Sequence, residues 1–258
     1  MTNLDAELRT AVEAARRAGA EVIRLRDEGV RFGRKSGREL VSEADLRAAE
    51  MLHSDLTSAF PDAGWLSEEH IDDPDRLRHE RVWIVDPIDG TREYLQGIPE
   101  FAISIGLAIG GETVLGVVYN PANDEMHAAI VPPGVPAQPG RSSSEAYDVL
   151  VGRGEAGWDE VPPLPGKARV AGVGSVAYRL ARLAAGAGDT VVTNYGRAEW
   201  DVAAGIALCK AAGVNVTDVL GDPIRFNKPN PDIRGLLAAR DPLHGEIRVY
   251  FDSIMRRR

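Results

Sequence analysis

The chain contains, at residues 83–91, the segment WIVDPIDGT. Its first three residues are large and apolar, which is typical of a buried strand, and the strand runs into two aspartates, Asp86 and Asp89. Pro87 restrains the backbone between these acids, so both carboxylates and the Ile88 carbonyl can converge on a hard cation that prefers oxygen ligands. A plain acidic turn after a strand is the alternative, but the complete pattern favours a metal site.

The end of the same segment favours binding of a phosphate group. Gly90 permits a close backbone approach, and the amides of Gly90 and Thr91 could hold phosphate oxygens if a helix begins there. A second turn, with the sequence GVGS at residues 172–175, precedes a helical pattern, so the Gly174 amide and the Ser175 hydroxyl could also face a ligand oxygen. That second motif is weak, because a plain turn from strand to helix has the same sequence.

Apolar runs predict a sheet in the first half of the chain. Gly, Pro, Asn and Asp separate the runs, as expected between consecutive strands. The runs lie at residues 82–85, 101–109, 114–119 and 126–131. Before them, apolar residues recur at helical spacing over residues 4–18 and 42–56. The first half therefore looks like helices packed on a sheet.

A change of composition divides the chain into two predicted lobes. Residues 132–144 are rich in Pro, Gly and Ser and cannot easily hold a strand or a helix. We therefore expect an N-terminal α+β lobe of residues 1–140 and a C-terminal lobe of residues 141–258. In the second lobe, apolar runs alternate with helical patterns that follow Ser175 and Trp200, which predicts an α/β lobe. Those runs lie at residues 149–151, 170–173 and 190–192.

Composition and charge limit the class of protein. With 258 residues, of which 44% are hydrophobic and 27% charged, the chain has the make-up of a folded protein of catalytic size. A formal net charge of -9 disfavours a nucleic-acid polymer or an anionic membrane surface as a partner. To bind an anionic substrate, such a protein needs positive charge at the site itself, and bound divalent cations would supply it.

The single cysteine, Cys209, indicates a reducing location. No intramolecular disulfide can form, so we expect a cytoplasmic protein. Cys209 lies in an apolar stretch and is expected to be a small buried hydrophobe. The N-terminal residues show neither a readable signal peptide nor a transmembrane helix. The arginines at residues 256–258 are expected to form a solvated tail.

Further acidic residues could join the metal site or could serve structure alone. Glu68 and Glu69 are adjacent and repel each other, so in isolation they would be a solvated pair, whereas a nearby cation would favour their ionised forms. Asp201 begins a helical stretch of small residues, where it could cap the helix or act as a third carboxylate ligand. Asp45 could complete a capping box with Ser42 or could accept a hydrogen bond from a hydroxyl that orients an attacking water. Spacing alone does not separate these two roles.

Together these residues resemble the inositol monophosphatase superfamily of Mg²⁺-dependent, lithium-sensitive phosphatases. The resemblance covers almost the whole chain, and its specific parts are SEE at residues 67–69, DPIDGT at 86–91 and WDVAAG at 200–205. Within the superfamily, the segment TREY at residues 91–94 looks most like the CysQ-type 3′(2′),5′-bisphosphate nucleotidases. Asn194 stands where inositol monophosphatases usually have a glutamate that contacts inositol.

The resemblance implies a layered α/β/α/β/α sandwich of the inositol monophosphatase and fructose-1,6-bisphosphatase type, with the metals between the lobes and commonly a homodimer. By resemblance, the ligands of two or three Mg²⁺ ions are Glu68, Asp86, Asp89, Asp201 and the Ile88 carbonyl. Asp45 and Thr91 would position the nucleophilic water, and Glu69 would assist. The implied substrate contacts are Gly90, Thr91, Gly174, Ser175, Asn194 and Glu199.

The implied activity is hydrolysis of a small phosphomonoester by metal-activated water. Adenosine 3′,5′-bisphosphate, hydrolysed to AMP and phosphate, is the preferred substrate, which would place the enzyme in sulfur assimilation. Inositol 1-phosphate is the alternative, and fructose 1,6-bisphosphate is a third candidate. A non-catalytic sensor of Mg²⁺ or of a phosphate ligand is disfavoured, because the expected carboxylates and Thr91 are all present.

Overall fold

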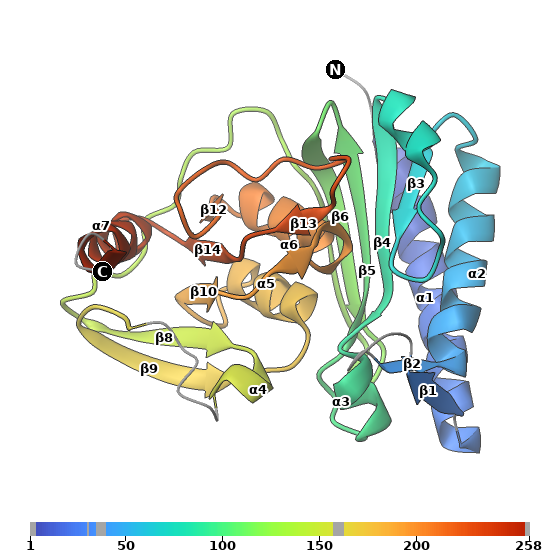
Figure 1. Ribbon diagram of the computed structural model, residues 1–258, viewed down its shortest axis with the longest axis horizontal. Coiled ribbons are helices and arrows are strands. Elements are labelled where there is room, and N and C mark those ends of the chain that lie inside the picture. Colours follow the sequence, from blue (N-terminus) through green and yellow to red (C-terminus); the bar gives the residue numbers. More distant parts are fainter. Residues whose placement is uncertain (1–3, 30, 35–39, 157–162, 256–258) are drawn as a thin grey trace.

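The computed structural model describes residues 4–29, 31–34, 40–156 and 163–255. Layers of helix, sheet, helix, sheet and helix alternate along the longest axis of the molecule (Figure 1). This is the layered α/β sandwich that the sequence predicts. The arginines at 256–258 lie outside the described residues, and the position of the lobe boundary stays a prediction.

Two helices, α1 (Asp5–Glu28) and α2 (Glu43–Ala59), form the outer layer beside the first sheet. Both bury a face rich in alanine, the residue with the highest helix propensity. A hairpin of β1 (Phe32–Arg34) and β2 (Leu40–Ser42) connects them. The capping box expected from the sequence is present, since the Ser42 hydroxyl accepts from the Asp45 amide while the Asp45 carboxylate accepts from the Ser42 amide.

The first sheet has five strands in the order β3-β4-β5-β6-β7. Its strands are β3 (Gly64–Ser67), β4 (Arg81–Asp89), β5 (Ala102–Ile109), β6 (Glu112–Asn120) and β7 (Glu125–Ile130). β3 pairs with β4 in parallel, and the other pairs are antiparallel. A short 3₁₀ helix, η1 (Pro74–Arg78), precedes β4. The four strands expected from the apolar runs are therefore confirmed, whereas β3 had no comparable signal.

A bulge interrupts β4 at the segment that carries the two aspartates. Asp86 pairs with Ser104 and Asp89 pairs with Ala102, so the stretch between the aspartates is one residue longer than its partner on β5. Pro87 lies inside the bulge, where its missing N–H removes no regular ladder hydrogen bond. Bulges bend a strand and re-aim its side chains. The bulge thus directs this acidic end out of the sheet and into the short helix α3 (Thr91–Leu95).

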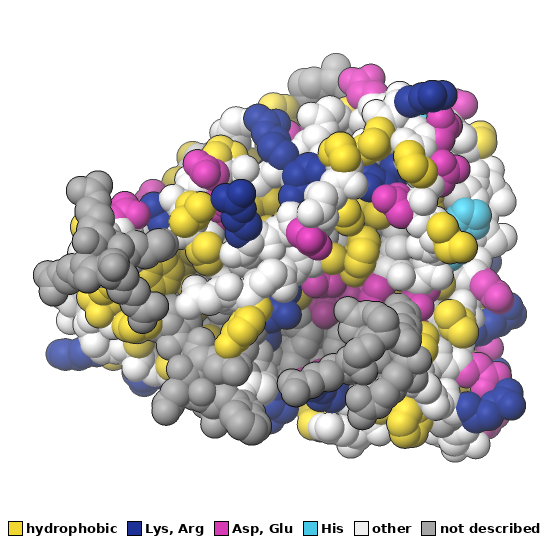
Figure 2. Space-filling model, viewed as in Figure 1, with side chains coloured by type: hydrophobic (Ala, Val, Ile, Leu, Met, Phe, Trp, Pro, Cys, Tyr) yellow, Lys and Arg dark blue, Asp and Glu magenta, His cyan; other side chains and the backbone are white. Residues whose placement is uncertain are grey.

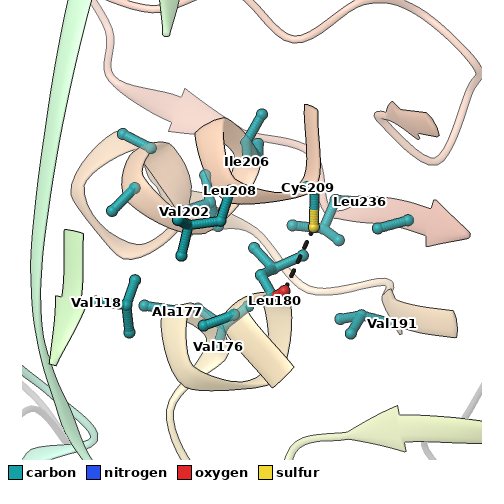
Figure 3. Packing of buried hydrophobic residues seen from close by; sticks show 14 of the residues in the cluster. Val118, Val176, Ala177, Leu180, Val191, Val202, Ile206, Leu208, Cys209 and Leu236 are labelled. Atoms are coloured by element: carbon teal, nitrogen blue, oxygen red, sulfur yellow. Dashed lines mark hydrogen bonds between the residues drawn. The ribbon is translucent and has the colours of Figure 1, made fainter. Parts of the chain in front are cut away.

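Helices α5 (Val176–Ala184) and α6 (Glu199–Ala211) form the layer between the two sheets. Figure 3 shows their apolar side chains facing one another, together with Val118 from the first sheet and Val191 from the second. Cys209 is part of this cluster, and its thiol donates to the Leu180 carbonyl at 3.4 Å. Burial raises the pKa of the Cys209 thiol to about 12, which agrees with its interpretation as a buried hydrophobe.

Small residues let α6 lie directly on the first sheet. A Cβ built on Gly116 of β6 would stand 2.2 Å from the Ala204 carbonyl oxygen, and one on Gly106 of β5 would stand 2.8 Å from the Ala203 Cβ. Neither distance is compatible with a real Cβ. The small residues after Asp201 therefore bring the start of α6 close to β5, where the Ser104 hydroxyl donates to the Trp200 carbonyl at 3.3 Å.

The second sheet has five strands in the order β12-β14-β10-β8-β9. They are β8 (Ala146–Val151), β9 (Lys167–Gly172), β10 (Thr190–Thr193), β12 (Asn215–Thr217) and β14 (Leu236–Ala239). α7 (Leu243–Met255) covers its outer face, α4 (Arg153–Ala156) follows β8, and β11 (Arg197–Ala198) pairs with β13 (Asp232–Ile233). Within the described ranges, no helix combines the length and apolar character needed to cross a membrane.

Replacing Gly116 with alanine should destabilise the fold, because the new Cβ would force α6 away from the sheet. Overpacking of this kind costs about 1–3 kcal/mol, and we expect the upper end, since the atom it meets belongs to the backbone. Urea unfolding would measure the change. Gly33→Ala is the matched control, because no atom of the described residues lies within 4 Å of its Cβ position. It should change stability by less than about 0.5 kcal/mol, and equal losses for both variants would contradict the packing argument.

Candidate active site

A cavity of about 590 Å³ opens where β4, α3, α5 and α6 meet. Its size is within the range of small-molecule sites. The face drawn in Figure 2 has acidic side chains gathered near its middle with basic side chains close by. The acidic residues that line the cavity are Glu68, Asp86, Asp89, Glu93 and Asp201. Residues far apart in the sequence thus form one strongly charged site.

The aspartates are each held by a hydrogen bond through one oxygen. Asp86 Oδ1 accepts from the Ile88 amide at 2.9 Å, inside the β4 bulge. Asp89 Oδ2 accepts from the Ser175 hydroxyl and the Ala177 amide, both at 2.6 Å, at the start of α5. Asp201 Oδ2 accepts from the Ala198 amide at 3.0 Å, in the first turn of α6. Asp201 therefore binds a backbone amide at the start of α6, as expected for a capping residue, and it also lines the cavity.

The carboxylates raise one another's affinity for protons. Burial, followed by the charge of Glu68, raises the pKa of Asp86 well above its ordinary value. Burial also raises the pKa of Asp89, although hydrogen bonds from Ser175 and Ala177 oppose the shift. For Asp201, burial and then the charge of Asp89 raise the pKa to about 7. The cluster of carboxylates therefore lacks the positive charge that would keep all of its members ionised.

The chemistry of these donors fits a hard divalent cation. Every acidic group at this end offers oxygen, which Mg²⁺ prefers, and in the described part of the chain the second oxygen of Asp86, Asp89 and Asp201 meets no protein donor. Within the same residues, no group of three or more Asp, Glu, His or Cys side chains is arranged to hold a metal ion as it stands.

Thr91 links the cavity to the start of α2. Its hydroxyl lies 2.9 Å from Asp45 Oδ1 and 3.1 Å from the Ile88 carbonyl oxygen. Asp45 is buried, and its other oxygen, Oδ2, accepts from the Ser42 amide at 2.8 Å and the Ser42 hydroxyl at 2.5 Å. Asp45 therefore completes the capping box through one carboxylate oxygen and accepts from Thr91 through the other.

The two phosphate-binding turns expected from the sequence both line the cavity. Gly90 has φ +95°, a backbone conformation that favours glycine. Ser175 has φ +49°, which is unusual for a residue with a side chain. Its hydroxyl donates to Asp89 and accepts from the Tyr178 amide at 3.0 Å, which caps α5. Gly174 lies beside it in the lining.

Four predicted site residues lie outside the lining. Glu199 is fully buried, and its carboxylate accepts from the Asn227 amide at 2.6 Å and the Lys228 amide at 3.1 Å, so a substrate contact there stays a prediction. Asn194 is exposed beside the lining residue Tyr195, and Glu69 is partly buried after Glu68. Asp45 accepts from Thr91, which does line the cavity.

Sequence reasoning missed the basic half of the site. The arginines that line the cavity are Arg92, Arg153, Arg179 and Arg197. Arg179 is buried and donates to the Val173 carbonyl at 2.8 Å, and Arg179 and Arg197 both act to lower the pKa of Asp89. The one available signal was the need for cations near an anionic substrate in an acidic protein, but it does not say which arginines.

Comparison with known proteins places the chain in a family. The model of the inositol monophosphatase family matches residues 3–137 and 140–255. The inositol-1-monophosphatase of Mesorhizobium japonicum is 36% identical over 232 residues, which cover 83% of this chain and 86% of that protein.

Solved structures agree at the level of the fold. The extragenic suppressor protein SuhB of Bartonella henselae is 28% identical, with a TM-score of 0.79 and coverage of 96% of this chain and 98% of that one. CysQ of Bacteroides thetaiotaomicron has a TM-score of 0.73 over 92% of this chain and 99% of that one, but its 23% identity shows the fold alone. With the family model matching nearly the whole chain, this protein belongs to the inositol monophosphatase family.

Proposed function

We propose that the chain is a Mg²⁺-dependent phosphomonoesterase. The observation that supports this most strongly is the meeting of Glu68, Asp86, Asp89 and Asp201 in one cavity beside the hydrogen-bonded pair of Thr91 and Asp45. The donor set suits a hard cation, and the arginines of the lining suit an anion. The family match supports the phosphatase class.

The residues proposed to hold Mg²⁺ are Glu68, Asp86, Asp89, Asp201 and the Ile88 carbonyl. When bound, the cations would neutralise phosphate charge and activate water for in-line attack. Their number, two or three by resemblance, stays a prediction.

Thr91 is proposed to align the attacking water. Its hydroxyl donates to Asp45 or to the Ile88 carbonyl, so its lone pairs are free to accept a hydrogen bond from water in the cavity. Asp45 fixes the direction of that hydroxyl. As the water loses a proton to Thr91 Oγ1, the Thr91 hydroxyl proton can pass to Asp45 Oδ1, which becomes a neutral carboxylic acid. This is the geometry of a general-base relay.

Two substrates have separate support. The relative from Mesorhizobium japonicum is called an inositol-1-monophosphatase, which favours inositol 1-phosphate. The arginines of the lining favour a substrate with more negative charge, and so does Asn194, which stands where related phosphatases usually have a glutamate. Adenosine 3′,5′-bisphosphate is therefore our first choice. Fructose 1,6-bisphosphate remains the third candidate. The homodimer, cytoplasmic location, lithium sensitivity and role in sulfur assimilation also stay predictions.

Asp89→Asn should remove nearly all Mg²⁺-dependent phosphate release while the fold is kept. An amide cannot supply the ligand charge, and even outer-shell partners of metal ligands are worth about 10–100-fold. Phosphate release at limiting Mg²⁺ and circular dichroism would measure the two effects. Asp62→Asn, at an exposed carboxylate, is the control. A folded Asp89 variant with normal activity would remove Asp89 from the ligand set.

Three substitutions should separate the two roles of Asp45. Thr91→Val should lower kcat by about a hundredfold or more with little change in stability or Mg²⁺ affinity. Ser42→Ala should chiefly lower the unfolding free energy, by about 1 kcal/mol, and Asp45→Asn should do both. Steady-state kinetics, Mg²⁺ titration and urea unfolding would be compared. If Thr91→Val and Asp45→Asn turned over normally, Asp45 would keep only its capping role.

The choice of substrate can be tested directly. We expect kcat/KM for adenosine 3′,5′-bisphosphate to exceed that for inositol 1-phosphate and fructose 1,6-bisphosphate, measured side by side with Mg²⁺. A preference of about tenfold or more for inositol 1-phosphate, about 1.4 kcal/mol of transition-state binding, would replace the nucleotidase assignment. Mg²⁺ binding without phosphate release from any of the three would favour a sensor.

A further inference from the structure

One carboxylate outside the lining joins the two halves of the chain by binding two residues that line the cavity. Glu100 lies in the loop between α3 and β5. Its Oε1 accepts from Arg153 Nη2 at 2.5 Å, and its Oε2 accepts from Arg153 Nε at 3.0 Å and from the Gly174 amide at 2.7 Å. The carboxylate therefore binds both the turn after β8 and the turn before α5.

The loop that carries Glu100 is itself fixed. Asn120 is fully buried, and its side-chain amide donates to the Pro99 carbonyl at 3.0 Å while its oxygen accepts from the Ala122 amide at 3.0 Å. The Glu100 carbonyl oxygen lies 2.6 Å from where a Cβ on Gly174 would be. Close packing and buried hydrogen bonds thus hold the Glu100 backbone in place.

This arrangement sets the direction of the Arg153 side chain. A guanidinium has five N–H donors, and the bidentate contact with Glu100 uses donors on Nε and Nη2 only. Among the described residues no acceptor is recorded for its remaining donors, and the side chain lines the cavity and is 44% exposed. Arg92 is near, since its Nη1 lies 3.9 Å from the Cβ position of the neighbouring Gly154.

Arg153 is paired with Glu100 rather than with the aspartates. Its guanidinium donates to both oxygens of that carboxylate, and Glu100, with Glu93 after it, raises the pKa of Arg153. The cations that act on the pKa of Asp89 are Arg179 and Arg197. The lining therefore includes an arginine beyond those two, held by a carboxylate that is not one of the aspartates.

We propose that Glu100 is a positioning residue that presents Arg153 to a second anionic group of the substrate, a phosphate that is not the one hydrolysed. The proposal rests on the phosphomonoesterase function proposed above, and it makes Arg153 the residue that selects bisphosphates over monophosphates. Arginine suits this role because its planar fork matches phosphate oxygens.

Two effects of Glu100 oppose each other. Its charge weakens the attraction of Arg153 for an anion, but solvent screens that effect at a half-exposed side chain. Its hydrogen bonds hold a long side chain in one orientation before the ligand arrives, and this removes an entropy loss that binding would otherwise include. We expect the fixed orientation of Arg153 to affect anion binding more than the charge of Glu100 does.

The first test replaces Arg153 with methionine, which removes the charge. We expect kcat/KM for adenosine 3′,5′-bisphosphate to fall about tenfold or more, equivalent to about 1.4 kcal/mol, while that for p-nitrophenyl phosphate, which has a single phosphate, changes little. Arg153→Lys should be intermediate, since it keeps the charge without the fork. The control is Arg225→Met, at an exposed ion pair with Glu112, which should leave both values unchanged.

A binding measurement removes the dependence on turnover. In metal-free buffer the carboxylate end repels phosphate, so calorimetric titration with AMP should report on Arg153. The Arg153→Met variant should bind AMP about tenfold more weakly than the wild type. Wild-type protein that releases no phosphate from any ester would refute the proposed function, whereas unchanged AMP binding by the variant would refute the role of Arg153.

Glu100→Gln tests the positioning role. It should raise KM for adenosine 3′,5′-bisphosphate about threefold with kcat unchanged, and KM for p-nitrophenyl phosphate should stay the same. Circular dichroism and thermal unfolding would establish that the variant is folded. A fall in kcat on both substrates would indicate a structural role only, and a lower KM for the bisphosphate would show that the charge of Glu100 outweighs its orienting effect. Either result would overturn the proposal.

Discussion

The site depends on keeping like charges together at the junction of two sheets. Asp86, Asp89 and Asp201 repel one another and are withdrawn from water, which raises the pKa of each. The chain offsets this by giving each aspartate a backbone amide, from the β4 bulge, the start of α5 and the start of α6. Those three elements must therefore meet at one place, and the glycines of β5 and β6 make the approach of α6 possible.

The cavity of this acidic protein has basic side chains as well as carboxylates in its lining. Arg179 and Arg197 act on Asp89, whereas Arg153 donates to Glu100. The formal net charge of -9 consequently says little about the local field. A phosphate ester in the cavity would meet these cationic groups, and bound divalent cations would complete the reversal of charge.

The sequence predicts the acidic half of the site better than the basic half. The strand that ends in WIVDPIDGT can be recognised because a long apolar run leads into acids spaced by proline, and all of those signals are local. The arginines have no such context, since a surface arginine and a cavity arginine look alike until the chain is folded. Glu199 shows the converse limit, because the resemblance implies a substrate contact there, whereas in the fold its carboxylate accepts from two backbone amides.

The pairing of short strands that lie far apart in the sequence could not be predicted either. The short strands β11 to β14 consist of two to four residues each, too few to show a period, and they exist because their partners are present. The capping box of Asp45 could be predicted from neighbouring residues, whereas its contact with Thr91, 46 positions away, appears only in the folded chain.

That double use of Asp45 ties the N-terminal turn of α2 to the chemistry of the cavity. Helix ends normally fray, opening and closing locally at little free-energy expense. Here, fraying of the first turn of α2 would withdraw the carboxylate that accepts from the Thr91 hydroxyl. In the proposed mechanism such a local opening would leave the water-aligning hydroxyl without its partner. The proposed function therefore requires the start of α2 to open less often than an ordinary helix end.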